Sequence, residues 1–233
     1  MTTSTSNHGS NFHHWIFLQQ ADLEELMNVL TTVPEADIEL LHRVSQKTIQ
    51  HLSDYQQTRS VHHGGDALSI YTPSSFENSL FWIGGLKPSI YIRLVYSIAG
   101  IDSKKLEFEL SKLLIIGDRI GSKRVMECND MQVKLIEALH VETVKSEDKI
   151  SSRMANLQEC VVIEPLMIGS LDGVERALEA HRVAFNEVVM DADELRVKVL
   201  TELVDHILTP LQGVHLLVAS TRLHLSIHEW GKR

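Results

Sequence analysis

The chain has 233 residues, of which 43% are hydrophobic and 23% are charged, so it can build a sizeable core without disulfides or metals. Its 31 acidic residues outnumber its 22 basic residues, which gives a net charge of −9. A surface of this sign repels phosphate backbones and no long basic cluster offsets it, so we expect no direct nucleic acid binding.

The first residues and the cysteines indicate the compartment. Residues 1–10 are rich in Ser and Thr and lack the apolar core of a signal peptide, and we expect them to be disordered. No apolar run approaches the roughly 20 residues of a membrane span, and Cys128 and Cys160 form no C-x-x-C pair. We therefore expect a protein of the nucleus and cytoplasm with reduced thiols and no membrane partner.

The start of the chain predicts two long helices. Ser10 or Asn11 can cap the first helix, and Pro34 opens the second, with acidic residues near the positive end of its dipole. Gly64-Gly65 ends the second helix. The first helix carries apolar residues at helical spacing: Trp15, Leu18, Leu23, Leu26 and Leu30.

Shorter elements follow. Ser74 to Glu77 form a capping box, in which a hydroxyl and a carboxylate satisfy two backbone N–H groups. We expect the helix they start to end in a left-handed turn at Gly84-Gly85. The other elements before residue 130 are a loop over 66–73, a helix from Pro88 to Ala99 closed by Gly100, a helix over 102–117 and a polar connection over 117–129.

Two long amphipathic helices are predicted for the second half, over 130–157 and 172–208, with Pro165 and Gly169-Ser170 between them. A last helix begins at Thr209-Pro210 and stops at Gly231. On the first long helix the expected core-facing side comprises Met131, Leu135, Ala138, Val141 and Ile150, and on the second it includes Val174, Leu178, His181, Phe185, Val188, Leu195 and Val199.

Together these elements predict an all-α fold, an antiparallel bundle of about seven to eight helices with two long helices in the C-terminal half. We expect one helical domain over residues 11–231, built from sub-bundles of about 11–117 and 129–231.

Signatures of enzymes are missing from the sequence. It contains no G-x-G-x-x-G, P-loop, G-x-S-x-G or H-E-x-x-H motif, and its carboxylates fall on helix faces beside Lys and Arg. We therefore expect a protein that binds other molecules and has no catalytic residues.

Two of the 13 histidines stand out. His224 and His228 are spaced i, i+4, so a helix places their rings on one face, as at one edge of a metal site. His13 and His14 lie on adjacent faces of a helix and cannot point at one ion together.

Three stretches resemble the plant Delay of Germination family, whose domain is shared with the TGACG-motif-binding bZIP factors. They are Phe81-Trp82-Ile83-Gly84-Gly85-Leu86-Lys87-Pro88-Ser89, then Asp191-Ala192-Asp193-Glu194-Leu195-Arg196, then Leu208-Thr209-Pro210-Leu211-Gln212-Gly213 running into Leu223 to Gly231. Several of these residues serve structure. Gly84, Gly85 and Pro88 are expected to make a helix–helix corner over Trp82, and the closing motif contributes Pro210, Gly213 and Trp230.

The resemblance also implies binding sites. The dormancy branch of the family is associated with haem, which here implies His224 and His228. Neighbours on one helix cannot take both axial positions of one iron, so one histidine would ligate and the other assist, or the second ligand would come from elsewhere. We expect no metal other than haem iron.

The branch is further associated with type-2C protein phosphatases, through a segment that corresponds to Phe12, His13, His14 and Trp15. Phe12 and Trp15 fit equally well as contacts onto the body of the bundle.

The resemblance thus implies a non-enzymatic regulator of seed dormancy, germination and abscisic acid signalling that acts through protein partners. The alternative is a nuclear transcriptional co-regulator, related to the bZIP factors but without their DNA-binding region. A third hypothesis is a sensor whose helical core holds haem or a lipid, and the amphipathic helices also fit a homodimer.

Overall fold

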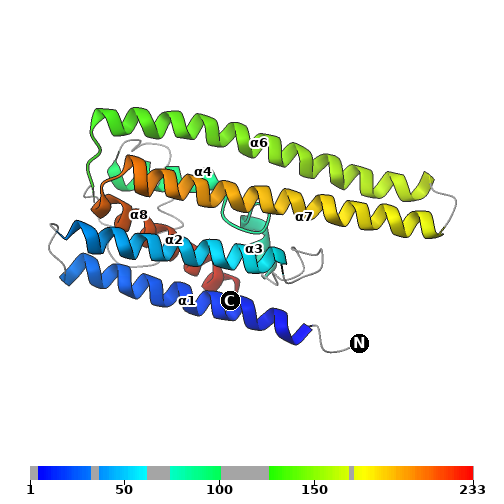
Figure 1. The fold of residues 1–233 in the computed structure, drawn as a ribbon, viewed down its shortest axis with the longest axis horizontal. Coiled ribbons are helices and arrows are strands. Elements are labelled where there is room, and N and C mark those ends of the chain that lie inside the picture. Colours follow the sequence, from blue (N-terminus) through cyan, green and yellow to red (C-terminus); the bar gives the residue numbers. More distant parts are fainter. Residues whose placement is uncertain (1–4, 33–36, 62–73, 101–125, 168–170, 233) are drawn as a thin grey trace.

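The computed structural model describes residues 5–32, 37–61, 74–100, 126–167 and 171–232, which fold almost entirely into helices (Figure 1). In chain order the elements are α1 (Thr5–Thr32), α2 (Ile38–Val61), α3 (Ser75–Leu80), α4 (Pro88–Ala99), α6 (Asp130–Met167), α7 (Leu171–Thr201), the π-helix η1 (Glu202–Ile207) and α8 (Pro210–Gly231). Within these ranges the β-structure amounts to one isolated bridge, between Trp82 and Gly85. The predicted all-α class and the helical bundle are confirmed.

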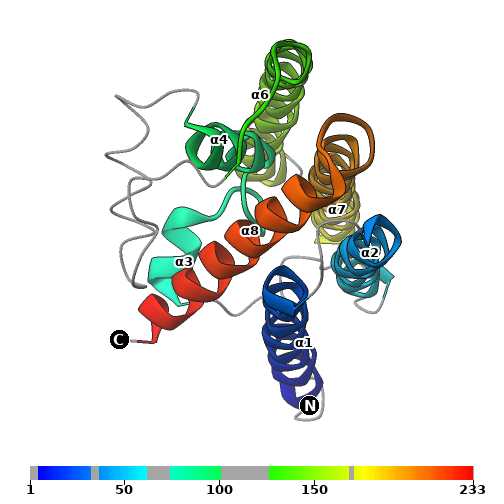
Figure 2. The ribbon, with the colours of Figure 1, turned by 90° about the vertical axis from the view of Figure 1, so that its left-hand side faces the viewer.

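The long helices lie in one layer, and the last helix crosses this layer. α1, α2, α7 and α6 lie side by side, and α8 runs across them on the side that α3 and α4 also occupy (Figure 2). α8 contacts α1, α2, α3, α4 and η1, and α4 also packs directly on α6 and α7. The two long helices, α6 and α7, pack along each other.

One large apolar core holds these helices together. Leu26 of α1 and Ile92 of α4 belong to the same buried cluster as Leu203 of η1 and Leu217 of α8. Residues from both predicted sub-bundles therefore contribute to a shared core.

No helix within the described ranges is long and apolar enough to cross a membrane.

Several helix ends form as their local sequence predicts. Ser74 and Glu77 make both hydrogen bonds of a capping box at the start of α3. Gly100 closes α4 with a φ of 64°, in the left-handed region that glycine enters at little cost. Thr209 and Gln212 form a second capping box, directly before Pro210 opens α8.

Other boundaries differ from the sequence-based expectation. α1 begins at Thr5, so residues 5–10, expected to be disordered, form its first turns. α3 ends at Leu80, before Gly84-Gly85, because the chain is already extended at Phe81. α6 continues through Pro165, which occupies its last turn, to Met167. Beyond Thr201 the second long helix continues only as the π-turn. The expected loop over 66–73, the helix over 102–117 and most of the connection over 117–129 lie outside the described residues.

The buried side of α6 is also not the expected one. Met131, Leu135, Ala138 and Val141 were predicted to face the core but are exposed. Of the predicted set Ile150 is buried, and it shares the buried side with residues that were not predicted, two of them polar: Ile136, Leu139, Thr143 and Glu147. Glu147 is fully buried because its carboxylate accepts a hydrogen bond from Ser89 N–H at 2.6 Å, at the start of α4. Glu147, a charged residue that the apolar pattern cannot identify as buried, therefore lies on the side of α6 that faces the start of α4.

Candidate functional site

The best-connected polar side chain of the described chain is Arg196, on α7. Its guanidinium donates to the backbone carbonyls of Leu86 at 2.7 Å, Ile83 at 2.9 Å and Trp82. It also forms an ion pair with Asp193, one turn earlier, at 2.5 Å. Both side chains are buried, with exposed fractions of 2% and 9%. Hydrogen bonds to one buried cation thereby hold the backbone of the turn between α3 and α4.

Glycine is required in this turn for two different reasons. Gly84 has a φ of 74°, in the left-handed region, and follows Ile83, which has a φ of 46°. At Gly85 the requirement is steric, since a Cβ there would lie 3.0 Å from Arg196 Nε. The Trp82 ring stacks beside the same guanidinium, whose Cζ lies 5.5 Å from the ring centroid. The Gly84-Gly85 motif therefore lets the backbone approach the buried arginine.

Trp82 also ties this turn to the long helices. Its indole N–H donates to Ser151 on α6 at 2.9 Å, and its ring packs on the cluster of Ile150, Val188 and Ala192 between α6 and α7. Pro88 begins α4 directly after the turn. The expected corner is thus present, with Trp82 packed onto the α6–α7 pair.

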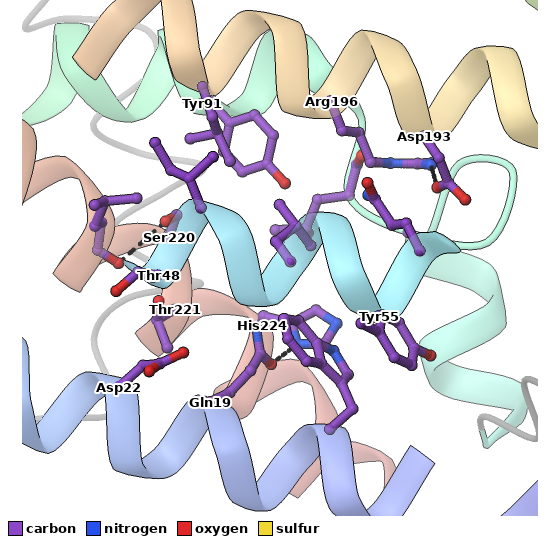
Figure 3. Close-up of a pocket in the computed structure, with 18 of the residues that line it drawn as sticks. Gln19, Asp22, Thr48, Tyr55, Tyr91, Asp193, Arg196, Ser220, Thr221 and His224 are labelled. Atoms are coloured by element: carbon purple, nitrogen blue, oxygen red, sulfur yellow. Dashed lines mark hydrogen bonds and ion pairs between the residues drawn. The ribbon is translucent and has the colours of Figure 1, made fainter. Parts of the chain in front are cut away.

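A cavity of about 60 Å³ lies next to the arginine, between α1, α2, α4, α7 and α8 (Figure 3). The side chains of Tyr91, Arg196 and Asp193 line one end of it, and those of His224, Gln19 and Asp22 line the other. Burial raises the pKa of Tyr91 to about 12. Burial also lowers the pKa of His224 to about 4, so this imidazole is neutral at physiological pH.

The charges around the cavity are compensated by the protein itself. Arg196 is paired with Asp193, and Asp22 accepts a hydrogen bond from His51 at 2.9 Å. Burial raises the pKa of Asp22, an effect that the hydrogen bond and the charge of His51 oppose. No lining charge is left to meet an ionised ligand, and the polar groups serve to hold the helices in register.

His224 and His228 occupy the same side of α8, as the i, i+4 spacing predicts. His224 Nδ1 is hydrogen-bonded to Gln19 on α1, and its ring lies 5.5 Å from that of Phe81. His228 Nδ1 lies 2.9 Å from a Glu77 carboxylate oxygen, and its ring meets Phe12 edge-on at 5.3 Å. Each histidine thus links α8 to α1 and to the segment around α3.

These rings do not leave space for haem. A hydrogen bond at Nδ1 is the arrangement that orients a metal-ligating imidazole, so the donor atoms by themselves suit iron. A ligand of haem size, however, needs a cavity of about 300–1,000 Å³, and the cavity beside His224 has about 60 Å³. His228 is 7% exposed and is covered by Phe12. Haem therefore does not fit the closed packing of α1 against α8. Within the described ranges no group of three or more His, Cys, Asp or Glu side chains could hold a metal ion.

The N-terminal residues expected to contact a partner divide into two sets. Phe12 and Trp15 are each 4% exposed, and Trp15 stacks on Tyr55 of α2 with ring centroids 4.5 Å apart. They belong to a small core of their own, with Ile16, so they anchor α1 to the bundle. His13 and His14 point away from this core and are exposed. Only these two remain available to a partner.

The remaining residues of the closing motif hold α8 in place. Gly213 faces η1, where a Cβ would lie 3.2 Å from Val204, and Trp230 meets Phe76 of α3 edge-on at 6.4 Å. Gly231 lies so close to α3 that a Cβ would be 2.1 Å from Ser74 Oγ. The C-terminus of α8 and the start of α3 therefore fit together only because Gly231 has no side chain.

Sequence patterns did not identify Arg196 and Asp193 as a buried pair. The sequence places carboxylates such as Asp193 on helix faces beside Lys and Arg, and the signal that indicates burial of this pair is its position. Ala192, Leu195 and Val199 are core-facing. Asp193 directly follows Ala192 and Arg196 directly follows Leu195, so both lie beside this core-facing row on the helix. A salt bridge set in an apolar stripe indicates burial.

Comparison with known proteins places these features in a family. Residues 22–97 match the model of the DOG1 family, described as seed dormancy control. Protein DOG1-like 3 of Arabidopsis thaliana is 30% identical over 100% of this chain and 88% of its own length. Protein DOG1-like 1 of the same plant is 32% identical over 95% of this chain and 87% of its own length. A more distant relative, Protein RESPONSE TO ABA AND SALT 1, is 23% identical over 92% of this chain.

Proposed function

Because this chain belongs to the DOG1 family of seed dormancy control, we propose that it is a non-enzymatic regulator of seed dormancy and germination that acts in the abscisic acid response by binding other proteins. The name of one relative, RESPONSE TO ABA AND SALT 1, supports the link to this hormone. The observation that carries the proposal is the use of the buried polar groups. Arg196, Asp193, Glu77 and His228 all bond to other groups of the protein, which is the role of scaffold residues.

The outer face of α1 is the surface we assign to the protein partner. His13, Phe17, Gln20 and Glu24 are exposed and follow one another at helical spacing. Phe17 is 67% exposed and stands among polar neighbours. An exposed aromatic side chain surrounded by polar residues is typical of a binding hot spot. The partner class is the type-2C protein phosphatases, as the family resemblance implies.

Substitution of single exposed residues tests this surface better than truncation does. Removing residues 1–16 would also remove Phe12 and Trp15 and so unfold part of the core. We expect Phe17→Asp to weaken binding to a purified type-2C phosphatase at least ~10-fold, measured by biolayer interferometry. Met190→Asp is the matched control, because Met190 is 51% exposed on α7. It should leave the dissociation constant unchanged.

Two results would refute the proposal. Equal binding by the Phe17→Asp and Met190→Asp variants would exclude the α1 face, and no binding by the unaltered chain to several type-2C phosphatases would exclude the partner class. The physiological role has its own test, in which seeds lacking the protein are germinated with and without abscisic acid. Germination identical to that of normal seeds would rule out a role in dormancy.

A further inference from the structure

Three uncharged polar side chains in the wall of the cavity beside Arg196 form no hydrogen bond with any residue in the described part of the chain. They are the hydroxyl of Tyr91 on α4, the amide of Gln56 on α2 and the hydroxyl of Thr221 on α8. Their residues are 5%, 7% and 5% exposed, so all three groups lie in the interior. The cavity is therefore lined by hydrogen-bonding groups that the protein itself does not use.

The Tyr91 hydroxyl points into this cavity (Figure 3). Because burial raises the pKa of Tyr91 to about 12, the hydroxyl keeps its proton at physiological pH and can both donate and accept a hydrogen bond. Buried polar groups in folded proteins are nearly always bonded, either to the protein or to a molecule held beside them. The orientation of Tyr91 therefore indicates a bound molecule.

The cavity's size and its apolar wall limit what this molecule can be. Its volume of about 60 Å³ exceeds the roughly 30 Å³ that one water occupies, and is well below the roughly 150 Å³ of a cavity that holds benzene. Leu200 and Leu217 also line it, and beside them a water lacks the two to four polar partners that it needs. A molecule with a short carbon skeleton can contact these leucines while its polar atoms bond to Tyr91, Gln56 and Thr221.

The charges of the wall require this molecule to be neutral. Arg196 is paired with Asp193, and Asp22 with His51, while burial holds the pKa of His224 near 4, so its ring is uncharged. An ion that entered would lose its hydration without meeting a free opposite charge. The unused hydroxyl and amide groups, which each donate and accept, suit a hydroxyl or a primary amide instead.

We propose that this cavity is a binding site for a small uncharged molecule that carries a hydroxyl or primary amide and has about four non-hydrogen atoms. Such a molecule contacts α1, α2, α4, α7 and α8 together, so its binding stabilises the closed packing of these helices. The site lies inside the bundle, whereas the surface assigned to the protein partner is the outer face of α1, and neither depends on the other.

Acetamide and acetate are matched probes, because they share one shape and differ in charge. Acetamide should shift the methyl NMR signals of Leu200 and Leu217 and saturate with a dissociation constant on the order of 1–10 mM, since so few atoms cannot bind tightly. Acetate at the same concentrations should cause no saturating shift of these signals.

Removing single hydroxyls tests the contacts. Tyr91→Phe and Thr221→Val should each weaken acetamide binding roughly 5-fold. Both variants should keep the fold, because neither hydroxyl bonds to another described residue, and the dispersion of their NMR spectra checks this. Tyr96→Phe is the matched control, since it removes a hydroxyl from the same helix outside the cavity and should bind acetamide like the unaltered chain.

Three results would each overturn the proposal. Acetamide shifts that never saturate would show that water alone fills the cavity. Saturable binding of acetate at these leucines would show that the site does not select an uncharged molecule. Equal acetamide binding by the Tyr91→Phe and Tyr96→Phe variants would show that the Tyr91 hydroxyl does not contact the ligand.

Discussion

Replacing Arg196 by Ala should be among the most damaging single changes in the protein. The substitution leaves the buried Asp193 carboxylate without its cation and three carbonyls, those of Trp82, Ile83 and Leu86, without their donor. Breaking a buried ion pair from one side costs about 3–5 kcal/mol, and each stranded carbonyl adds on the order of 1 kcal/mol where the turn cannot relax. We expect a loss of about 5 kcal/mol, a large part of the roughly 5–15 kcal/mol that stabilises a domain.

The chain supplies a matched control. Arg182 pairs with Glu179 at the same i, i+3 spacing and at 2.6 Å, but the two side chains are 44% and 58% exposed. Arg182→Ala should therefore cost less than about 1 kcal/mol. For a chain of this length, the midpoint temperature of thermal unfolding should fall by roughly 10–20 °C in Arg196→Ala and by less than about 4 °C in Arg182→Ala.

A second substitution separates burial of charge from loss of contacts. Adding Asp193→Ala to Arg196→Ala removes the unpaired carboxylate and should restore part of the lost stability, measured by urea unfolding with circular dichroism. If the two arginine variants lost the same stability, or if Asp193→Ala made Arg196→Ala still less stable, the account of a buried cation holding the turn would be wrong.

Three further predictions follow from the packing of α8. Gly231→Ala should destabilise the protein by about 1–3 kcal/mol in urea unfolding, because its Cβ would lie 2.1 Å from Ser74 Oγ and 2.9 Å from Glu77 Oε2; a gain in stability, as helix propensity alone predicts, would contradict the close fit. On acidification, His224 binds a proton near pH 6.5 in the unfolded chain and only near pH 4 in the folded chain. Its neutral form therefore stabilises the folded state at neutral pH, and this stabilisation is lost as the pH falls from 6.5 to 4. Between pH 7 and pH 4 the unaltered chain should therefore lose up to about 3 kcal/mol more than His224→Gln, and equal losses in urea unfolding would show that the imidazole is not buried. Mixing hemin with the protein should produce the same Soret spectrum for the unaltered chain and for His224→Ala/His228→Ala, and a band present only in the unaltered chain would show that α1 opens to admit haem.

The features that the sequence predicted correctly depend on a few neighbouring residues. The capping box of Ser74 and Glu77, the left-handed end of α4 at Gly100 and the start of α8 at Pro210 all follow from side chains within one turn of the helix end. The placement of His224 and His228 on one side of α8 likewise needs only the helical period.

The features that escaped prediction depend on partners far along the chain. Arg196 is buried because carbonyls about 110 residues away meet its guanidinium, and Glu147 is buried because Ser89 N–H does the same for its carboxylate. A hydrophobicity scale assigns both residues to the surface. For the same reason, the pattern of hydrophobic residues predicted the wrong buried side for most of α6. Phe12 and Trp15 were ambiguous, because an aromatic residue near a helix start fits a partner and a core equally well. The burial of both side chains, with Trp15 stacked on Tyr55 and Phe12 against His228, assigns them to the core.

The central position of α8 has a consequence for synthesis on the ribosome. The bonds of His224 to Gln19 and of His228 to Glu77 join residues 205 and 151 positions apart, so they cannot form until translation has passed through α8. Until then α1 and α2 lack the helix on which their apolar sides pack, and the nascent chain must be kept from aggregating. A premature stop codon shortly before Pro210 would remove about a tenth of the 233 residues and yet leave a product without α8, unable to complete its core.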